Sequence, residues 1–131
     1  MFNTLIYAEH KNGKLKNTAF ELLSKASEFS NSISAVMIGK NTQELAPTLF
    51  HYGAQKVFII ENDALVPYTA EGYSTALSSL IKENNFNVFL APCSISSKDY
   101  LPRLSIKLDC GLASDCIELE LKNEKLAIKR P

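Results

Sequence analysis

The chain has 131 residues, 46% of them hydrophobic and 21% charged, which is the composition of an ordinary soluble globular domain. Its 14 basic and 14 acidic residues balance, so charge gives no support for a nucleic-acid partner, and no apolar run approaches the roughly 20 residues of a membrane helix. Three cysteines without zinc-binding spacing, and no signal-peptide pattern, favour a reducing, cytoplasmic location without membrane insertion.

Short apolar runs alternate with helical patterns along residues 2–108, and this order predicts four strand–helix units. Strands are expected at residues 2–8, 33–38, 56–60 and 86–91, each apolar throughout, as a strand buried on both faces should be. A turn is expected at Asn12-Gly13, and helices at about residues 18–29, 42–53, 69–84 and 97–108. This order predicts a three-layer α/β/α domain around a mainly parallel, doubly wound sheet.

Particular residues mark the expected helix ends. Thr18 and Glu21 fit a capping box, in which the Thr hydroxyl accepts from the amide three residues on while Glu21 reaches back. Pro47 should shorten or kink the second helix, and Gly53 suits the position just after its end. Pro102 is expected near the first turn of the fourth helix, where its missing N–H costs little.

The pattern changes after residue 108 from helical spacing to strict alternation. Ser114–Leu121 and Lys125–Lys129 read as two strands separated only by three residues, which predicts a C-terminal antiparallel hairpin. No linker or low-complexity tract interrupts the chain, so residues 1–131 are expected to form a single domain.

Ligands of a doubly wound sheet bind outside the carboxyl ends of its strands, and Cys93 and His10 both follow such ends. Cys93 would be a nucleophile if a base, for example His10 approaching in space, stabilised its thiolate; the simpler interpretation is an inert buried thiol. His10 with Glu9 could form an acid–base pair, although a solvated loop histidine is the simpler interpretation.

The other candidate residues also have structural interpretations. Arg103 could grip a phosphate or a partner's carboxylate, but a salt bridge is the default interpretation. His51 suits a helix C-terminus, Asp109 lies at the end of the helix after Cys93, and Ser114-Asp115 suits a turn or strand entry. Tyr68, Tyr73 and Phe20 read as core packing. The five glycines form no phosphate-binding loop, so we expect no catalytic, cofactor-binding or metal-binding residue in this chain.

An ordered set of short segments resembles one family. The set comprises Ala8-Glu9-His10, Gly53–Val57, Tyr68–Tyr73, Leu90-Ala91-Pro92, Asp99–Leu104, Leu108-Asp109, Gly111-Leu112 and Ser114-Asp115. Each is weak alone, but their order and spacing resemble the N-terminal domain of the electron transfer flavoprotein alpha subunit over essentially the whole chain. Arg130-Pro131 resembles the start of the segment that leads into the family's further strands.

The resemblance implies an adenine-nucleotide alpha-hydrolase-like fold and a role in electron transport. In the family, the alpha subunit forms a heterodimer with a beta subunit that commonly holds AMP, and FAD is held chiefly by the alpha subunit's C-terminal domain. The heterodimer carries electrons from flavin dehydrogenases, such as those of fatty acid beta-oxidation, to a quinone reductase or another acceptor. The resemblance thus implies a non-catalytic electron-transfer subunit, cytoplasmic in bacteria and in the mitochondrial matrix of eukaryotes.

This sequence departs from the family pattern after Arg130-Pro131, because no C-terminal FAD domain follows. We therefore expect a domain truncated at its C-terminal edge, with no cofactor bound by this chain alone, and no family FAD contact is carried over. Two alternatives remain: a stand-alone nucleotide-binding module of universal-stress-like fold, and a small thiol enzyme that uses Cys93.

Overall fold

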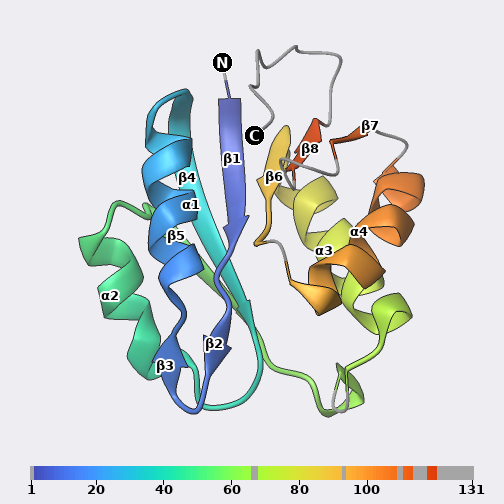
Figure 1. Cartoon of the computed structure of the whole chain (residues 1–131), viewed down its shortest axis with the longest axis horizontal. Coiled ribbons are helices and arrows are strands. Elements are labelled where there is room, and N and C mark those ends of the chain that lie inside the picture. The colour runs from blue at the N-terminus through green and yellow to red at the C-terminus, as the bar shows by residue number, and fades with distance from the viewer. Residues whose placement is uncertain (1, 66–67, 93, 109–110, 114–117, 121–131) are drawn as a thin grey trace.

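The computed structural model describes residues 2–65, 68–92, 94–108, 111–113 and 118–120 (Figure 1). Its main sheet contains the strands β1 (Phe2–Tyr7), β4 (Ser30–Ile38), β5 (Lys56–Ile60), β6 (Val88–Leu90), β7 (Gly111–Ala113) and β8 (Glu118–Glu120). A separate hairpin consists of β2 (His10–Lys11) and β3 (Lys14–Leu15). The helices are α1 (Asn17–Ser27), α2 (Ala46–His51), α3 (Ala70–Asn84) and α4 (Ile95–Leu108), with 3-10 turns η1 (Gln43–Leu45) and η2 (Asp63–Leu65).

The main sheet has the strand order β5-β4-β1-β6-β8-β7. The pairs β5–β4, β4–β1 and β1–β6 are parallel, whereas β8 is antiparallel to both of its neighbours. After β1, the chain forms β4 and β5 on one side of β1 and then returns to form β6 on its other side. The predicted doubly wound, mainly parallel sheet is therefore confirmed, and its strand order switches between β1 and β6.

Two hydrophobic clusters lie on opposite faces of the sheet, and alternate residues of β1 divide between them. Leu5 and Tyr7 belong to the cluster that includes α3 and α4, while Ile6 and Ala8 belong to the cluster that includes α1 and α2. Figure 1 accordingly shows α1 and α2 on one side of the sheet and α3 and α4 on the other. This arrangement confirms the three-layer architecture and explains why the core strands are apolar on both faces.

The capping box predicted at Thr18 is wrong. Helix α1 begins at Asn17, its N-cap is Lys16 in extended conformation, and no side chain caps it. The Lys16 amide donates to the Glu9 carbonyl at 2.9 Å and the Ala19 amide donates to the Lys16 carbonyl at 3.0 Å, so the chain turns into the helix before Thr18. The buried Thr18 hydroxyl has no hydrogen-bond partner among the described residues.

The second predicted helix is divided in two, as Pro47 suggested. The 3-10 turn η1 precedes α2, and Pro47 stands in the first turn of α2. Gly53 has φ +114°, its amide donates to the Phe50 carbonyl at 3.2 Å, and the Ala54 amide donates to Leu49 at 3.1 Å. These are the two bonds of a Schellman motif, which confirms the position predicted for Gly53.

Pro102 lies inside α4 and not near its first turn, so that prediction is wrong. The helix begins at Ile95, because the Ser94 hydroxyl accepts from the Ser97 amide at 3.2 Å and the Ser94 carbonyl accepts from the Lys98 amide at 3.0 Å. A proline at this depth removes one internal hydrogen bond. Pro102 lies on the exposed face of α4.

An antiparallel pair lies at the C-terminal end of the described chain. Strand β8 lies within the predicted segment Ser114–Leu121, and it pairs with β7 through Leu112 and Leu119 and on its other edge with β6. The predicted second strand, Lys125–Lys129, lies outside the described residues, so that hairpin stays a prediction. At the other boundaries, β4 begins three residues earlier than predicted and β6 is shorter.

Helix α4 provides a test of the packing that holds the α3–α4 layer. The Leu104 side chain is fully buried between the layers, whereas Ile106 on the same helix is 80% exposed. We expect Leu104→Ala to lower the free energy of unfolding by about 2–5 kcal/mol and Ile106→Ala to change it by no more than about 0.5 kcal/mol. Urea unfolding followed by circular dichroism measures both, and equal effects would contradict the assigned faces of α4.

Candidate functional site

The carboxyl ends of β1 and β6 form the switch point of the sheet, where a doubly wound fold usually binds its ligand. Tyr7 ends β1, and the residues that follow β6, Ala91 and Pro92, are buried. Ser94 follows and caps α4, so the loop leads directly into that helix.

A cluster of tyrosine side chains lies beside the carboxyl end of β1. The ring centroids of Tyr7 and Tyr100 lie 5.9 Å apart, those of Tyr73 and Tyr100 6.0 Å, and those of Tyr68 and Tyr73 4.7 Å. Tyr100 is 1% exposed and Tyr7 6% exposed, while Tyr73 and Tyr68 continue the cluster toward the surface. The prediction that Tyr68 and Tyr73 pack against the core is confirmed.

Burial of this cluster changes the acidity of its phenols. Burial, the largest cause, raises the pKa of Tyr7 and of Tyr100 well above the ordinary value near 10, and nearby phenols and the Glu9 carboxylate raise both further. The Ser97 hydroxyl, 3.4 Å from the Tyr100 oxygen, acts in the opposite direction on Tyr100 but does not cancel the effect of burial. The phenols of Tyr7 and Tyr100 therefore stay protonated far above pH 7. This suits side chains that pack in the core and not groups that release a proton.

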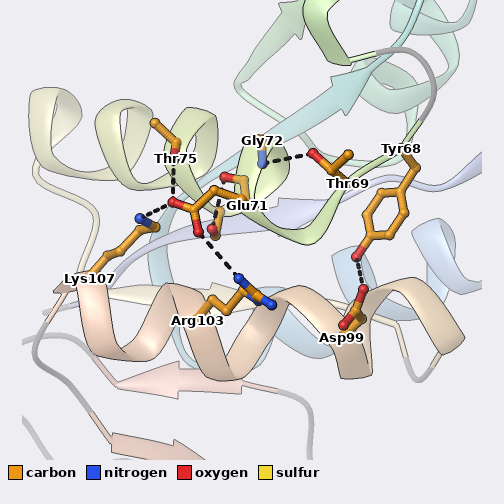
Figure 2. Close-up of polar contacts among 9 residues, drawn as sticks. Tyr68, Thr69, Glu71, Gly72, Thr75, Asp99, Arg103 and Lys107 are labelled. Atoms are coloured by element: carbon orange, nitrogen blue, oxygen red, sulfur yellow. Dashed lines mark hydrogen bonds and ion pairs between the residues drawn. The ribbon is translucent and has the colours of Figure 1, made fainter.

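At the surface end of the cluster, Tyr68 joins the loop before α3 to α4 (Figure 2). Its hydroxyl donates to an Asp99 carboxylate oxygen at 3.0 Å and to the Ser96 carbonyl at 3.1 Å. Partial burial and then these Asp99 contacts raise the pKa of Tyr68. The pair ties the entry of α3 to the first turns of α4.

The start of α3 carries a second tie to α4, centred on Glu71 (Figure 2). Lys107 Nζ donates to Glu71 at 2.7 Å, and an Arg103 nitrogen lies 3.4 Å from its other oxygen. The hydrogen bond from Lys107 is the main cause that lowers the pKa of Glu71. Arg103 thus forms the salt bridge that was its default interpretation. Glu71 is exposed, so the network orients the helices and adds little stability.

The sequence interpretation missed Glu71 and Lys107, although a signal was present. Arg103 and Lys107 stand at i and i+4 on α4, where their side chains share one face and can meet a common carboxylate. Nothing local to Glu71 indicates which helix it faces, because the pairing depends on how α3 and α4 pack together.

His10 and Glu9 each have a partner other than the acid–base pair suggested for them. The His10 Nε2 atom lies 3.0 Å from the Ile38 carbonyl oxygen, which holds the ring against the end of β4. A Cβ atom at Gly39 would lie 3.1 Å from the His10 ring, and the Gly39 φ of +145° also favours glycine. Glu9 lies 3.7 Å from the Lys16 ammonium. We interpret both residues as structural.

Other candidates are either packed or lie outside the described residues. His51 ends α2, with its ring centroid 5.4 Å from that of Tyr52, and Phe20 packs against Tyr52 at 4.4 Å. Cys93, Asp109 and Ser114-Asp115 fall outside the described residues. Within the described part of the chain, His, Cys, Asp and Glu form no group of three that could hold a metal ion, and no helix there is long and apolar enough to cross a membrane.

A family profile described as the electron transfer flavoprotein domain matches residues 4–131. The chain belongs to the electron transfer flavoprotein family. It is 34% identical over 125 residues to the electron transfer flavoprotein subunit alpha of Syntrophomonas wolfei, covering 95% of this chain and 39% of that protein. The Bacillus subtilis subunit alpha is 33% identical, with 97% of this chain and 40% of that protein covered.

A relative with another name belongs to the same family. The acryloyl-CoA reductase electron transfer subunit beta of Anaerotignum propionicum is 32% identical and covers 92% of this chain and 34% of that protein. The chain therefore spans about two fifths of the length of these electron transfer flavoprotein relatives, or somewhat less. The resemblance to the alpha subunit is confirmed.

The raised pKa values of the tyrosine cluster predict alkaline unfolding. The unfolded chain ionises its phenols near pH 10 while the folded chain does not, so stability is fully present below that pH and is lost as pH rises above it. We expect Tyr100→Phe to weaken this decline while changing stability at pH 7 by about 1 kcal/mol or less. Urea unfolding between pH 8 and about pH 11 measures the effect.

The exposed Tyr52 is the matched control for this experiment, because its ring lies outside the cluster. If Tyr52→Phe changed the alkaline decline as much as Tyr100→Phe, burial of the cluster would not be its cause.

Proposed function

We propose that residues 1–131 form the N-terminal domain of an electron transfer flavoprotein alpha subunit and act as the scaffold of an electron carrier. The observation that carries this proposal is the match to the family along nearly the whole chain, from residue 4 to residue 131. The burial of Tyr7 and Tyr100 against each other supports a structural role for the residues beside the carboxyl end of β1.

FAD is the cofactor of the full-length family protein, and the residues described here do not fit it. No loop of the described chain has the spaced glycines that let a backbone approach a pyrophosphate. We therefore propose that FAD is held by the family's C-terminal domain and that this chain performs no redox step itself.

The proposed partners follow from the family and from the names of relatives. We infer that the full protein pairs with a beta subunit and accepts electrons from flavin dehydrogenases of the acyl-CoA type, then passes them to a quinone reductase or another acceptor. The relative named as an electron-transfer subunit of acryloyl-CoA reductase supports a partner enzyme that acts on an acyl-CoA. The proposed location is the bacterial cytoplasm, or the mitochondrial matrix in a eukaryote.

Co-expression tests this assignment. Joined to a family C-terminal domain and co-expressed with a beta subunit, the chain should give a yellow heterodimer with a flavin absorption spectrum. Size-exclusion chromatography with absorbance detection measures both properties, and a colourless or unassociated product would contradict the proposal.

The alternative, a stand-alone nucleotide-binding module, predicts that the isolated chain binds ATP or AMP. Because no loop of the described chain has the glycine spacing of a phosphate-binding loop, we expect calorimetric titration with ATP and with AMP to release no binding heat. Heat at micromolar nucleotide would favour the alternative. The thiol-enzyme hypothesis stays a prediction, because Cys93 lies outside the described residues.

A further inference from the structure

The hairpin formed by residues 10–16, here called the basic hairpin, concentrates positive charge in a protein whose net charge is zero. Lys11, Lys14 and Lys16 are all exposed, and no acidic residue lies between them. Figure 1 shows β2 and β3 extending beyond the carboxyl end of β1, away from the main sheet. Only Leu15 of this hairpin packs against a hydrophobic cluster.

The basic hairpin is held in one conformation. Asn12 has φ +54° and Gly13 has φ +75°, which are the left-handed values of a type I′ turn, the connection that matches the twist of two paired strands. Its base is tied to the body of the protein twice, by the Lys16 amide on the Glu9 carbonyl and by His10 Nε2 on the Ile38 carbonyl.

Lys11 and Lys14, the two lysines that flank the tip, destabilise the strand pairing in which they lie. Lys11 and Lys14 stand directly opposite each other in the antiparallel register, a position at which like charges are destabilising. Neither forms a salt bridge within the described residues, whereas Lys40 near the hairpin base is paired with Asp63 at 2.6 Å. The exposed hairpin therefore carries two charges that destabilise its own strand pairing. Charges that do not stabilise the fold point to a role in binding another molecule.

We propose that the basic hairpin docks an acidic surface of a protein that exchanges electrons with the assembled carrier. This inference rests on the proposed function, because a carrier must meet its partners transiently and opposite charge accelerates such encounters. The backbone that carries these cations is already paired before the encounter, so little backbone freedom is lost on docking.

The chemistry of the hairpin favours a protein over other anionic partners. Its tip is Asn12-Gly13, which offers no apolar group to insert into a lipid surface. It carries no arginine for phosphate forks, and its one aromatic ring, His10, is held at the Ile38 carbonyl at the base of the hairpin, away from the tip.

The substitution Lys14→Glu separates recognition from stability. It replaces the like-charge pair by an opposite-charge pair, so the midpoint of urea unfolding should stay the same or rise while the positive tip is lost. Lys82→Glu is the matched control, because it makes the same charge change at an exposed position in the last turn of α3. A fall in the midpoint caused by Lys14→Glu alone would show that the lysine serves the fold and would overturn the inference.

Binding is measured with a decaglutamate peptide as the probe, by backbone amide shifts of the isotope-labelled chain in low salt. We expect shifts centred on residues 10–16, roughly fivefold or more weaker binding for Lys14→Glu, binding within about twofold of wild type for Lys82→Glu, and loss of the shifts near 0.5 M salt. Equal weakening by both variants would overturn the inference.

Two further probes test the other partner classes. A decathymidylate oligonucleotide or phosphatidylglycerol vesicles that bound the hairpin more tightly than the peptide would overturn the assignment to a protein partner. None of these readouts depends on flavin or on a beta subunit, so the inference and the proposed function can fail separately.

Discussion

The burial of β1 on both of its faces is the constraint on which the rest of this domain depends. The strand lies between β4 and β6 in parallel register, and its alternate residues contribute to both hydrophobic clusters. A strand in that position needs a helical layer on each side, and parallel neighbours can only be reached through crossovers. The order of helices and strands, the switch point between β1 and β6, and the place of the tyrosine cluster all follow from this one arrangement.

The same constraint brings aromatic side chains together beside the switch point of the sheet. Tyr7 from β1, Tyr73 from α3 and Tyr100 from α4 pack against one another there. Aromatic rings that bury large apolar areas stabilise the junction of these three elements. The surface ties of Tyr68 to Asp99 and of Glu71 to Lys107 then set how α3 lies against α4.

Sequence reasoning correctly predicted the elements that hydrophobic periodicity determines. It failed where a contact with another segment of the chain determines the structure. The strand at residues 56–60 and the helix beginning after Thr69 were predicted closely, because burial and a local cap define them. The capping box at Thr18 failed because a hydrogen bond from Lys16 to Glu9, across the hairpin, starts the helix earlier. The pairing of β8 with β6 had no local signal, because the two strands lie far apart in the sequence. The pairing of Glu71 had no local signal for the same reason.

The basic hairpin shows a different limit of sequence reasoning. What matters there is which residues pair across the two strands, and amino-acid composition does not show this. Net charge is zero, and three lysines in seven residues read as an ordinary solvated turn. Only the pairing of Lys11 with Lys14 shows that like charges are held face to face by a turn whose backbone allows little relaxation. Neutral or opposite charges at those two positions would serve the hairpin equally well or better. Selection for folding alone therefore does not account for both lysines, whereas a partner that presents carboxylates to this end of the sheet does.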